Sequence, residues 1–230
     1  MKADIFSRLI KARRARTSCA LVTRISDGCQ SLVVGDVAAG DLDLSSAHLD
    51  EISARLMADS SGPLESDAAL FARIYAPPYR LLVVGAVHIT QFLAPMAAMA
   101  GFAVTVIDPR RAFANADRFP DVAISDEWPD EAMARLVPDA QTAVVTLAHD
   151  PKLDDPALVA ALASPVFYIG ALGSRRTHDK RTARLAEQGA GDQISRIHAP
   201  VGLDLGGRSP AEIAVAILAQ IIQVKHRHDL

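Results

Sequence analysis

Two turns and one loop, all containing glycine, hold the residues of this sequence that could bind an anion or a nucleotide. The first turn is Gly85-Ala86-Val87-His88, which follows an aliphatic run at 81–84 and precedes a helical pattern. Asp108 ends the next aliphatic run, 23 residues after Gly85. In dinucleotide-binding folds the first glycine of such a turn permits a tight bend, the following helix stabilises phosphate, and the acid accepts hydrogen bonds from ribose.

The glycine pattern of this first turn departs from the dinucleotide fingerprint. Val87 and Thr90 stand where the second and third glycines belong. A valine side chain would crowd a pyrophosphate that lies against the backbone. The turn therefore fits a dinucleotide site and a Rossmann scaffold that binds no ordinary dinucleotide about equally well.

The second turn concentrates positive charge at the start of a predicted helix. The run GALGSRR contains Gly170, Gly173, Ser174, Arg175 and Arg176, and Lys180 and Arg181 follow one helical turn later. Backbone donors, the helix dipole, a hydroxyl and two guanidinium groups could converge there on an anion. We predict a phosphate site at this turn; the alternative is a solvated helix face whose glycines serve tight packing.

The third feature is a glycine-rich loop at 197–208, which leads into a well-marked helix. Ser209-Pro210-Ala211-Glu212 is a capping box with proline at the first helical position. A loop of this length with few hydrophilic side chains is more often functional than a plain linker. Gly202 and Asp204 lie in this loop, and Asp204 either binds a polar ligand or braces the loop.

No pattern in the sequence points to a catalytic group or a metal ion. Ser-His-Asp ordering, metal-ligand spacing and a Walker loop are all absent. Cys19 and Cys29 are too few and too close for a disulfide framework or a four-ligand zinc site. His149 ends a predicted strand, where ligands bind in α/β sheets, but a turn before Asp150-Pro151 explains it at least as well. We predict no catalytic residue and no metal ligand.

Alternating strands and helices after residue 79 must position these turns. The predicted strands are 81–84, 103–107, 122–124, 142–147 and 166–169, and the predicted helices are 91–100, 129–136, 156–163, 174–188 and one beginning at Ser209. This alternation implies βαβ units with right-handed crossovers and a parallel sheet. We therefore predict an α/β protein with a Rossmann-type parallel sheet domain and a small N-terminal α/β domain.

The N-terminal part of the chain has a different pattern. We expect a helix at 3–14, strands at 19–24, 30–34 and 70–75, and a helix at 43–57. Pro77-Pro78 follows, and proline neither continues a helix nor supplies a ladder donor. The predicted domains are therefore 1–76 and 77–230.

Composition restricts the classes of partner and the location. The 230 residues are 50% hydrophobic and only 5% aromatic, which suits buried aliphatic strands. A net charge of -3 gives no global attraction to nucleic acid or to an anionic membrane. The N-terminus lacks a signal-peptide core, and no apolar run reaches the roughly 18 residues of a membrane span. We expect a cytoplasmic protein without a membrane span.

Three stretches together resemble the xanthine dehydrogenase accessory factor family, XdhC/CoxI. They are LLVVGAVHITQFLAPMAAMAGFAVTVIDPR at 81–110, YIGALGSRRTHDKR at 168–181 and IHAPVGLDLGGRSPAEIAVAILAQII at 197–222. The resemblance implies a chaperone that binds molybdenum cofactor (molybdopterin), protects it, supports its sulfuration by a cysteine desulfurase and delivers it to a molybdenum hydroxylase. It implies a maturation factor for an enzyme such as xanthine dehydrogenase or carbon monoxide dehydrogenase, and not a turnover enzyme.

The resemblance also implies how the site residues divide between the parts of this cofactor. Gly85, His88 and Asp108, with Arg110, would form one side of a crevice. Gly170, Gly173, Ser174, Arg175 and Arg176 would hold the phosphate, and Gly202 and Asp204 would close over the pterin. The chain departs from the family at Val87, where members carry a second glycine, and in a shortened region around Cys29.

Two rival functions remain open at the level of sequence. An NAD(P)-dependent oxidoreductase would use the same crevice, supported by Asp108 at the ribose position and opposed by Val87. A scaffold subunit with a vestigial pocket would bind partners regardless of pocket mutations. The aliphatic helix at 213–224 has apolar residues on more than one face, which fits a homodimer and a buried helix equally well.

Overall fold

The computed structural model describes residues 2–228. The chain separates into two compact units, one ending at Pro77 and the other beginning at Pro78, and each is described by itself. Within the described residues, no helix is both long and apolar enough to cross a membrane. The predicted fold class is confirmed: an antiparallel sheet unit precedes a Rossmann-like parallel sheet.

The first unit is a five-stranded antiparallel sheet with one helix on each face. Its strands, in the order β3-β2-β1-β5-β4, are β1 (Cys19–Arg24), β2 (Gln30–Val34), β3 (Val37–Gly40), β4 (Gly62–Pro63) and β5 (Leu70–Tyr75), and its helices are α1 (Ala3–Arg14) and α2 (Ser46–Met57). Alternate residues of β1 face opposite ways: Ala20 and Val22 pack with Ile52 of α2, whereas Cys19 and Leu21 pack with Ile5 of α1.

The second unit is built on a six-stranded sheet in which every neighbouring pair is parallel. Its order is β11-β10-β9-β6-β7-β8, with β6 (Arg80–Val84), β7 (Ala103–Ile107), β8 (Ala123–Ser125), β9 (Thr142–Thr146), β10 (Tyr168–Ala171) and β11 (Ile197–His198). The central strands β6 and β9 are almost wholly buried, as expected for a parallel sheet covered on both faces.

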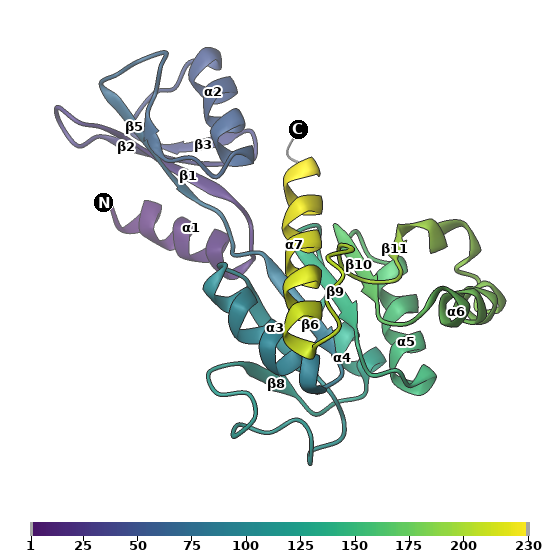
Figure 1. Cartoon of the computed structure of the whole chain (residues 1–230). Coiled ribbons are helices and arrows are strands. Elements are labelled where there is room, and N and C mark those ends of the chain that lie inside the picture. Colours follow the sequence, from purple (N-terminus) through teal and green to yellow (C-terminus); the bar gives the residue numbers. More distant parts are fainter. Residues whose placement is uncertain (1, 229–230) are drawn as a thin grey trace. The chain divides into compact units, whose positions relative to one another are not determined.

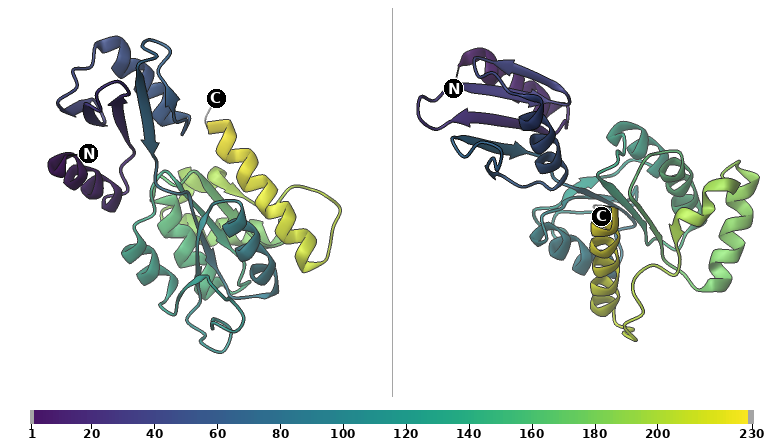
Figure 2. Two further views of the ribbon diagram at one scale, coloured as in Figure 1. Left: turned by 90° about the vertical axis from the view of Figure 1, so that its left-hand side faces the viewer. Right: turned by 90° about the horizontal axis from the view of Figure 1, so that it is seen from above.

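Helices cover both faces of this sheet (Figures 1 and 2). They are α3 (His88–Met99), α4 (Pro129–Leu136), α5 (Pro151–Leu162), α6 (Arg175–Glu187) and α7 (Pro210–His228), with a short 3-10 helix at Gly191–Arg196. One face packs on α3 and α7 through residues such as Leu93 and Ile217. The opposite face packs on α4, α5 and α6 through residues such as Met133, Leu158 and Leu185.

Two helices begin earlier than the sequence predicts. Helix α5 begins at Pro151 instead of residue 156, because the Asp150 side chain accepts a hydrogen bond from the Lys152 amide and Pro151 fits the first helical position. Helix α3 begins at His88 instead of residue 91. The sequence prediction also missed β3, β4, β11 and the 3-10 helix, all of which are short. The starts of α4 and α7 are as predicted.

Candidate functional site

The carboxyl ends of the parallel strands meet at one edge of the second unit's sheet. The chain order reverses between β6 and β9, because α3 leads from β6 to β7 while α5 leads from β9 to β10 on the other side. Ligands of open α/β sheets bind outside the carboxyl ends of the strands at such a reversal. The turn after β6, beginning at Gly85, and the turn after β9, ending at Asp150, therefore flank the candidate site.

The first turn depends on glycine at Gly85. Its φ is +108°, and a Cβ there would lie 2.7 Å from the backbone nitrogen of Ala148 in the adjoining turn. The Gly85 amide donates to the Ile107 carbonyl at 2.9 Å, and the Ala86 amide donates to Asp108 Oδ2 at 2.8 Å. Two backbone donors of this turn are therefore engaged by the neighbouring strand and its acid.

Asp108 is fully buried, and the chain's own donors engage both of its carboxylate oxygens. Oδ1 accepts from the Arg110 amide at 3.0 Å and from Arg110 Nε at 2.8 Å, while Arg110 Nη2 donates to Oδ2 at 2.7 Å. Burial acts to raise the pKa of Asp108, but the Arg110 guanidinium and the amides of Ala86 and Arg110 outweigh it and hold the pKa below its usual range. Asp108 thus braces the turn, and Arg110 would have to move before a ribose could bind to it.

Other side chains at the first turn lie at its rim. His88 is exposed and is the first residue of α3. Arg118 Nη1 donates to the Ala86 carbonyl at 3.0 Å and to the Phe113 carbonyl at 2.8 Å. The loop after β7 is therefore fixed over the first turn by a guanidinium that the sequence prediction did not consider.

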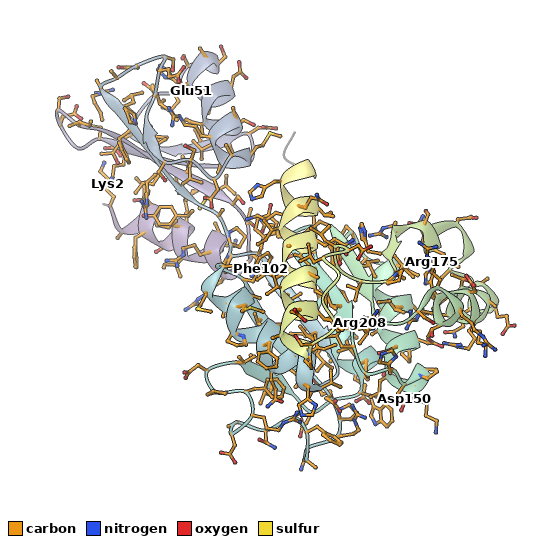
Figure 3. All side chains as sticks on the ribbon, viewed as in Figure 1. Lys2, Glu51, Phe102, Asp150, Arg175 and Arg208 are labelled. Atoms are coloured by element: carbon orange, nitrogen blue, oxygen red, sulfur yellow. The ribbon has the colours of Figure 1, made fainter. Side chains whose placement is uncertain are left out.

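The second turn joins β10 to α6. Ser174 is the N-cap of α6, and its hydroxyl accepts a hydrogen bond from the Thr177 amide at 3.2 Å. A Cβ on Gly170 would lie 2.5 Å from Val201 Cγ2, so the close approach of the following loop requires glycine there. Arg175, labelled in Figure 3 with Asp150, is exposed at the first position of α6.

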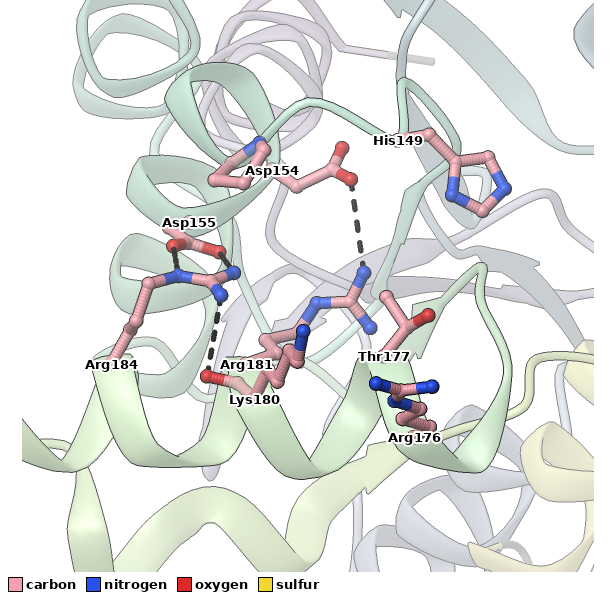
Figure 4. A pocket seen from close by; sticks show the side chains of 9 residues that line it. His149, Asp154, Asp155, Arg176, Thr177, Lys180, Arg181 and Arg184 are labelled. Atoms are coloured by element: carbon pink, nitrogen blue, oxygen red, sulfur yellow. Dashed lines mark hydrogen bonds and ion pairs between the residues drawn. The ribbon is translucent and has the colours of Figure 1, made fainter.

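A cavity of about 380 Å³ lies where the first turn of α5 meets α6 (Figure 4). Its walls include His149, Asp154, Arg176, Thr177, Lys180 and Arg181. His149 has a φ of +59°, in the left-handed region that non-glycine residues rarely adopt and that tends to occur at functional sites. Among the predicted site residues Arg176 lines this cavity, and its neighbour Arg175 does not.

Two pairs of opposite charge join α5 to α6 across this cavity. Arg184 holds Asp155 with two hydrogen bonds, of 2.6 Å from Nε and 3.0 Å from Nη2. Arg181 and Asp154 are only 3% and 2% exposed, and their closest atoms, Nη2 and Oδ2, lie 3.8 Å apart. Figure 4 shows the Arg181 guanidinium reaching from α6 toward Asp154.

The environment of the second pair opposes ionisation of both groups. Burial raises the pKa of Asp154 to about 7, although Arg181 and the amides of Ala148 and His149 act in the opposite direction. Burial likewise lowers the pKa of Arg181. Its Nη2 donates to the Leu172 carbonyl at 2.9 Å, while Nε and Nη1 have no hydrogen-bond partner.

The predicted loop residues Gly202 and Asp204 lie apart from this cavity's lining. The Gly202 amide donates to Gln220 Oε1 at 2.8 Å, which fixes the loop to α7. Asp204 is exposed, and its Oδ1 accepts from the Gly206 amide at 3.4 Å. In the structure Asp204 therefore braces the loop, which was one of its two predicted roles.

The predicted residues thus fall into three groups: the first turn, the start of α6 and the loop on α7. The sequence prediction included Lys180 and Arg181 only as added positive charge, and it did not assign His149, Asp154 or Asp155 to a site. Adjacent acids directly after a proline at a helix start were a signal that was available. In residues 2–228, no three His, Cys, Asp or Glu side chains gather as a metal site.

Comparison with known proteins gives relatives of one kind. Over 152 residues the chain is 33% identical to the molybdenum cofactor insertion chaperone PaoD of Escherichia coli strain K12, which covers 66% of this chain and 42% of PaoD. Over 159 residues it is 31% identical to a probable xanthine dehydrogenase subunit of Bacillus subtilis strain 168, which covers 69% of this chain and 46% of that protein. The chain spans less than half the length of the curated relatives it matches.

The fold has a counterpart among solved structures. A protein described as a xanthine dehydrogenase from Bacillus halodurans superposes with a TM-score of 0.71 at 25% sequence identity, covering 96% of this chain and 63% of that one. The model of the XdhC Rossmann domain matches residues 81–221, which include the first turn, both walls of the cavity and the loop on α7. The resemblance seen in the sequence is therefore confirmed, and this chain belongs to the XdhC family.

Proposed function

We propose that this chain is an accessory protein that binds molybdenum cofactor, protects it and delivers it in sulfurated form to a molybdenum hydroxylase. Family membership and the 33% identity to a molybdenum cofactor insertion chaperone support this proposal. The cofactor is cargo, so the residues of the chain bind, orient and shield it. The client is an enzyme such as xanthine dehydrogenase or carbon monoxide dehydrogenase, and a cysteine desulfurase is the proposed sulfur donor.

The observation that carries the proposal is the buried guanidinium of Arg181 at the reversal of strand order. The cargo carries a phosphate on a pterin, and a guanidinium with two donors to spare matches a phosphate in charge and geometry. The cavity beside it, of about 380 Å³, is in the range of small-molecule sites. The phosphate would bind there, between the first turns of α5 and α6.

The pterin would extend from this cavity toward the first turn. Electrostatics connects the two places, because Asp150 and Asp154 both contribute to raising the pKa of Arg110, after the larger effect of its hydrogen bonds to Asp108. Gly85 and His88 would then form one side of the crevice, with Asp108 and Arg110 as its rigid floor. Gly202 and Asp204 remain the proposed cover.

An NAD(P)-dependent oxidoreductase is the rival function, and the strand order favours it. This order is that of the classic dinucleotide-binding sheet, which binds its ligand at the same reversal. The first turn opposes it, because the Ala86 amide already donates to Asp108 and Val87 replaces the second glycine. Fluorescence titration with NADH separates the two: micromolar binding would support the rival, and no binding at millimolar NADH would remove it.

The test of the proposed function is cofactor retention. We expect the chain, purified from a host that makes molybdenum cofactor, to carry pterin near stoichiometry, measured by fluorescence after oxidation, together with molybdenum by elemental analysis. Arg176→Met combined with Arg181→Met should lower retention at least tenfold, because one charge-assisted hydrogen bond is worth roughly 1.5–3 kcal/mol.

A matched control keeps this test specific to the site. Arg24→Met lies in the first unit, where Arg24 pairs with the exposed Asp27, and it should leave retention unchanged. A wild-type chain that is empty and takes up no added cofactor would contradict the proposed function. Retention that survives the double substitution would place the phosphate elsewhere.

A further inference from the structure

Arg181 presents an unusual polar arrangement in the second unit. Its side chain is buried, and only one of its three nitrogens, Nη2, has a hydrogen-bond partner, the Leu172 carbonyl. The nearest carboxylate oxygen, Asp154 Oδ2, is 3.8 Å from that same nitrogen, beyond hydrogen-bond distance. Leaving charged donors unpaired in the interior is costly, so this arrangement is best understood as part of a binding site.

Asp154 faces the same cavity and can supply a second kind of donor. Its Oδ1 accepts from the Ala148 amide at 3.3 Å, and its Oδ2 is the oxygen nearest Arg181. Because burial raises the pKa of Asp154 to about 7, a substantial fraction of this carboxyl carries a proton near neutral pH. A protonated carboxyl donates one hydrogen bond to an anion, whereas an ionised one repels it.

The remaining charges of the cavity wall favour an anion. Arg184 is held by Asp155, so these two groups satisfy each other. Arg176 and Lys180 are exposed, and no carboxylate in residues 2–228 lies within ion-pair distance of either. The first turns of α5 and α6 both adjoin the cavity, and helix N-termini attract negative charge.

We propose that this cavity binds the tetrahedral oxyanion of a phosphate monoester, with Arg181 donating from Nε and Nη1 and the protonated carboxyl of Asp154 donating one further hydrogen bond. The cavity volume of about 380 Å³ exceeds that of a phosphate group, which leaves room for part of the esterified molecule. The inference rests on the proposed function only for the identity of that molecule. Nε and Nη1 are screened from solvent, so an exposed neighbour such as Thr177 or Lys180 rotates aside as the ligand enters.

Binding in this form takes up a proton on Asp154. The charged or titratable groups around Asp154 come from three elements: Asp155 on α5 with His149 in the turn before it, Arg181 and Arg184 on α6, and Arg110 after β7, whose raised pKa includes a contribution from Asp154. An added anion acts against ionisation of Asp154 and therefore strengthens its hold on the proton. Affinity should fall as the pH rises above about 7, where the carboxyl gives up its proton.

The test is calorimetric titration of the full chain, produced in a host that makes no molybdenum cofactor, with sodium sulfate at constant ionic strength. Sulfate keeps its two charges from pH 6 to pH 9, so any pH dependence belongs to the protein. We expect one site whose affinity falls up to tenfold per pH unit above pH 7. Measured at pH 8 in two buffers of different ionisation enthalpy, binding should take up a fraction of a proton approaching one.

Substitutions identify the groups responsible. Arg181→Met should weaken sulfate binding at least tenfold, and Arg176→Met, at an exposed position with little risk to folding, should weaken it several-fold. Arg175→Met removes an equal charge one residue outside the cavity lining and should change affinity less than twofold. Asp154→Asn should abolish the proton uptake; uptake that persists in this variant would assign it to another group, such as His149, and overturn the role of Asp154.

The outcomes separate this inference from the proposed function. Equal losses in Arg175→Met and Arg181→Met would show attraction to a charged helix start and overturn the site. Inorganic phosphate that binds as tightly as phenyl phosphate or a nucleoside 5′-monophosphate would show that free oxyanion is the ligand and overturn the monoester. A chain that retains pterin but binds no sulfate would refute this inference alone, whereas sulfate binding by a chain that never retains pterin would refute the proposed function alone.

Discussion

Asp108 and Asp154 are buried carboxylates that follow neighbouring regions of one sheet, and their surroundings are opposite. Asp108 accepts four hydrogen bonds from Ala86 and Arg110, which hold its pKa below the usual range. Asp154 accepts from backbone amides, faces Arg181 at 3.8 Å, and has its pKa raised to about 7 by burial. One acid is therefore a fixed structural anion, and the other is able to gain or lose a proton near neutral pH.

Asp154 should make the stability of the folded chain depend on pH. The folded chain binds this proton more tightly than the unfolded chain, in which an aspartate has a pKa near 3.9, so the carboxyl favours folding increasingly as the pH falls from about 8 toward 4. The free energy of unfolding of wild type minus that of Asp154→Asn should rise on acidification by up to about 1.4 kcal/mol per pH unit. Urea unfolding of both proteins at pH 5, 6, 7 and 8 measures this difference, and a difference that stays constant with pH would contradict it.

At the scale of elements, the β6–α3 turn and the α5–α6 pair play different parts. The turn is held rigid, because Gly85 packs against Ala148 and Asp108 engages the Ala86 amide. The two helices are joined by ion pairs, one of them tight, between Asp155 and Arg184, and one long, between Asp154 and Arg181. The long pair borders the cavity, so the adaptable contact lies where a ligand would bind.

Substitution of Gly85 tests the rigidity of the turn. Gly101→Ala, at a φ of +89° with nothing within 4 Å of the new Cβ, should cost only the roughly 1–2 kcal/mol of a left-handed backbone. Gly85→Ala, at +108° with the Ala148 nitrogen at 2.7 Å, should cost about 2 kcal/mol more because of the added overlap. Chemical denaturation followed by circular dichroism compares the two, and equal losses would mean that the turn yields easily.

The sequence predicts the elements that have strong local signals. The capping box beginning at Ser209 and the aliphatic run of β6 place α7 and the central sheet correctly. The predicted start of α5 is five residues late, because Asp150-Pro151 has the pattern of a turn although the same two residues cap and start a helix. Strands β4 and β11 have two residues each and exist only through pairing with distant partners, which no local pattern encodes.

The candidate site was only partly predictable for a related reason. Glycines and arginines at the start of α6 gave a local signal, and Arg176 does line the cavity. The contact of Asp154 with Arg181 joins residues from two helices, and its importance comes from burial, which depends on tertiary packing. Sequence spacing likewise could not show that Asp108 and Arg110 satisfy each other.

At the scale of the whole molecule, the chain consists of two compact units with separate cores. The first unit has its own sheet with α1 and α2 on opposite faces. The residues that line the cavity, from His149 to Arg184, all belong to the second unit. The oxyanion site is therefore complete within a single unit.

A fragment of residues 78–230 should fold and bind sulfate with the same affinity as the full chain. The physical reason is that the parallel sheet has helices on both faces within this fragment, so its core needs no contribution from the first unit. Circular dichroism with thermal unfolding tests folding, and calorimetry tests binding. A folded fragment whose affinity drops more than about threefold would show that the first unit contributes to the site.

The engagement of the Ala86 amide by Asp108 has a consequence for the evolvability of this turn. Val87→Gly alone would restore a glycine but leave the amide occupied and Arg110 seated on the acid. Releasing Arg110 alone would leave the valine in the path of a pyrophosphate and a buried carboxylate without its counterion. Neither single change gains a dinucleotide, and the second also lowers stability. The two positions are therefore epistatic, and a lineage with this turn is separated from nicotinamide chemistry by a fitness valley that single substitutions do not cross.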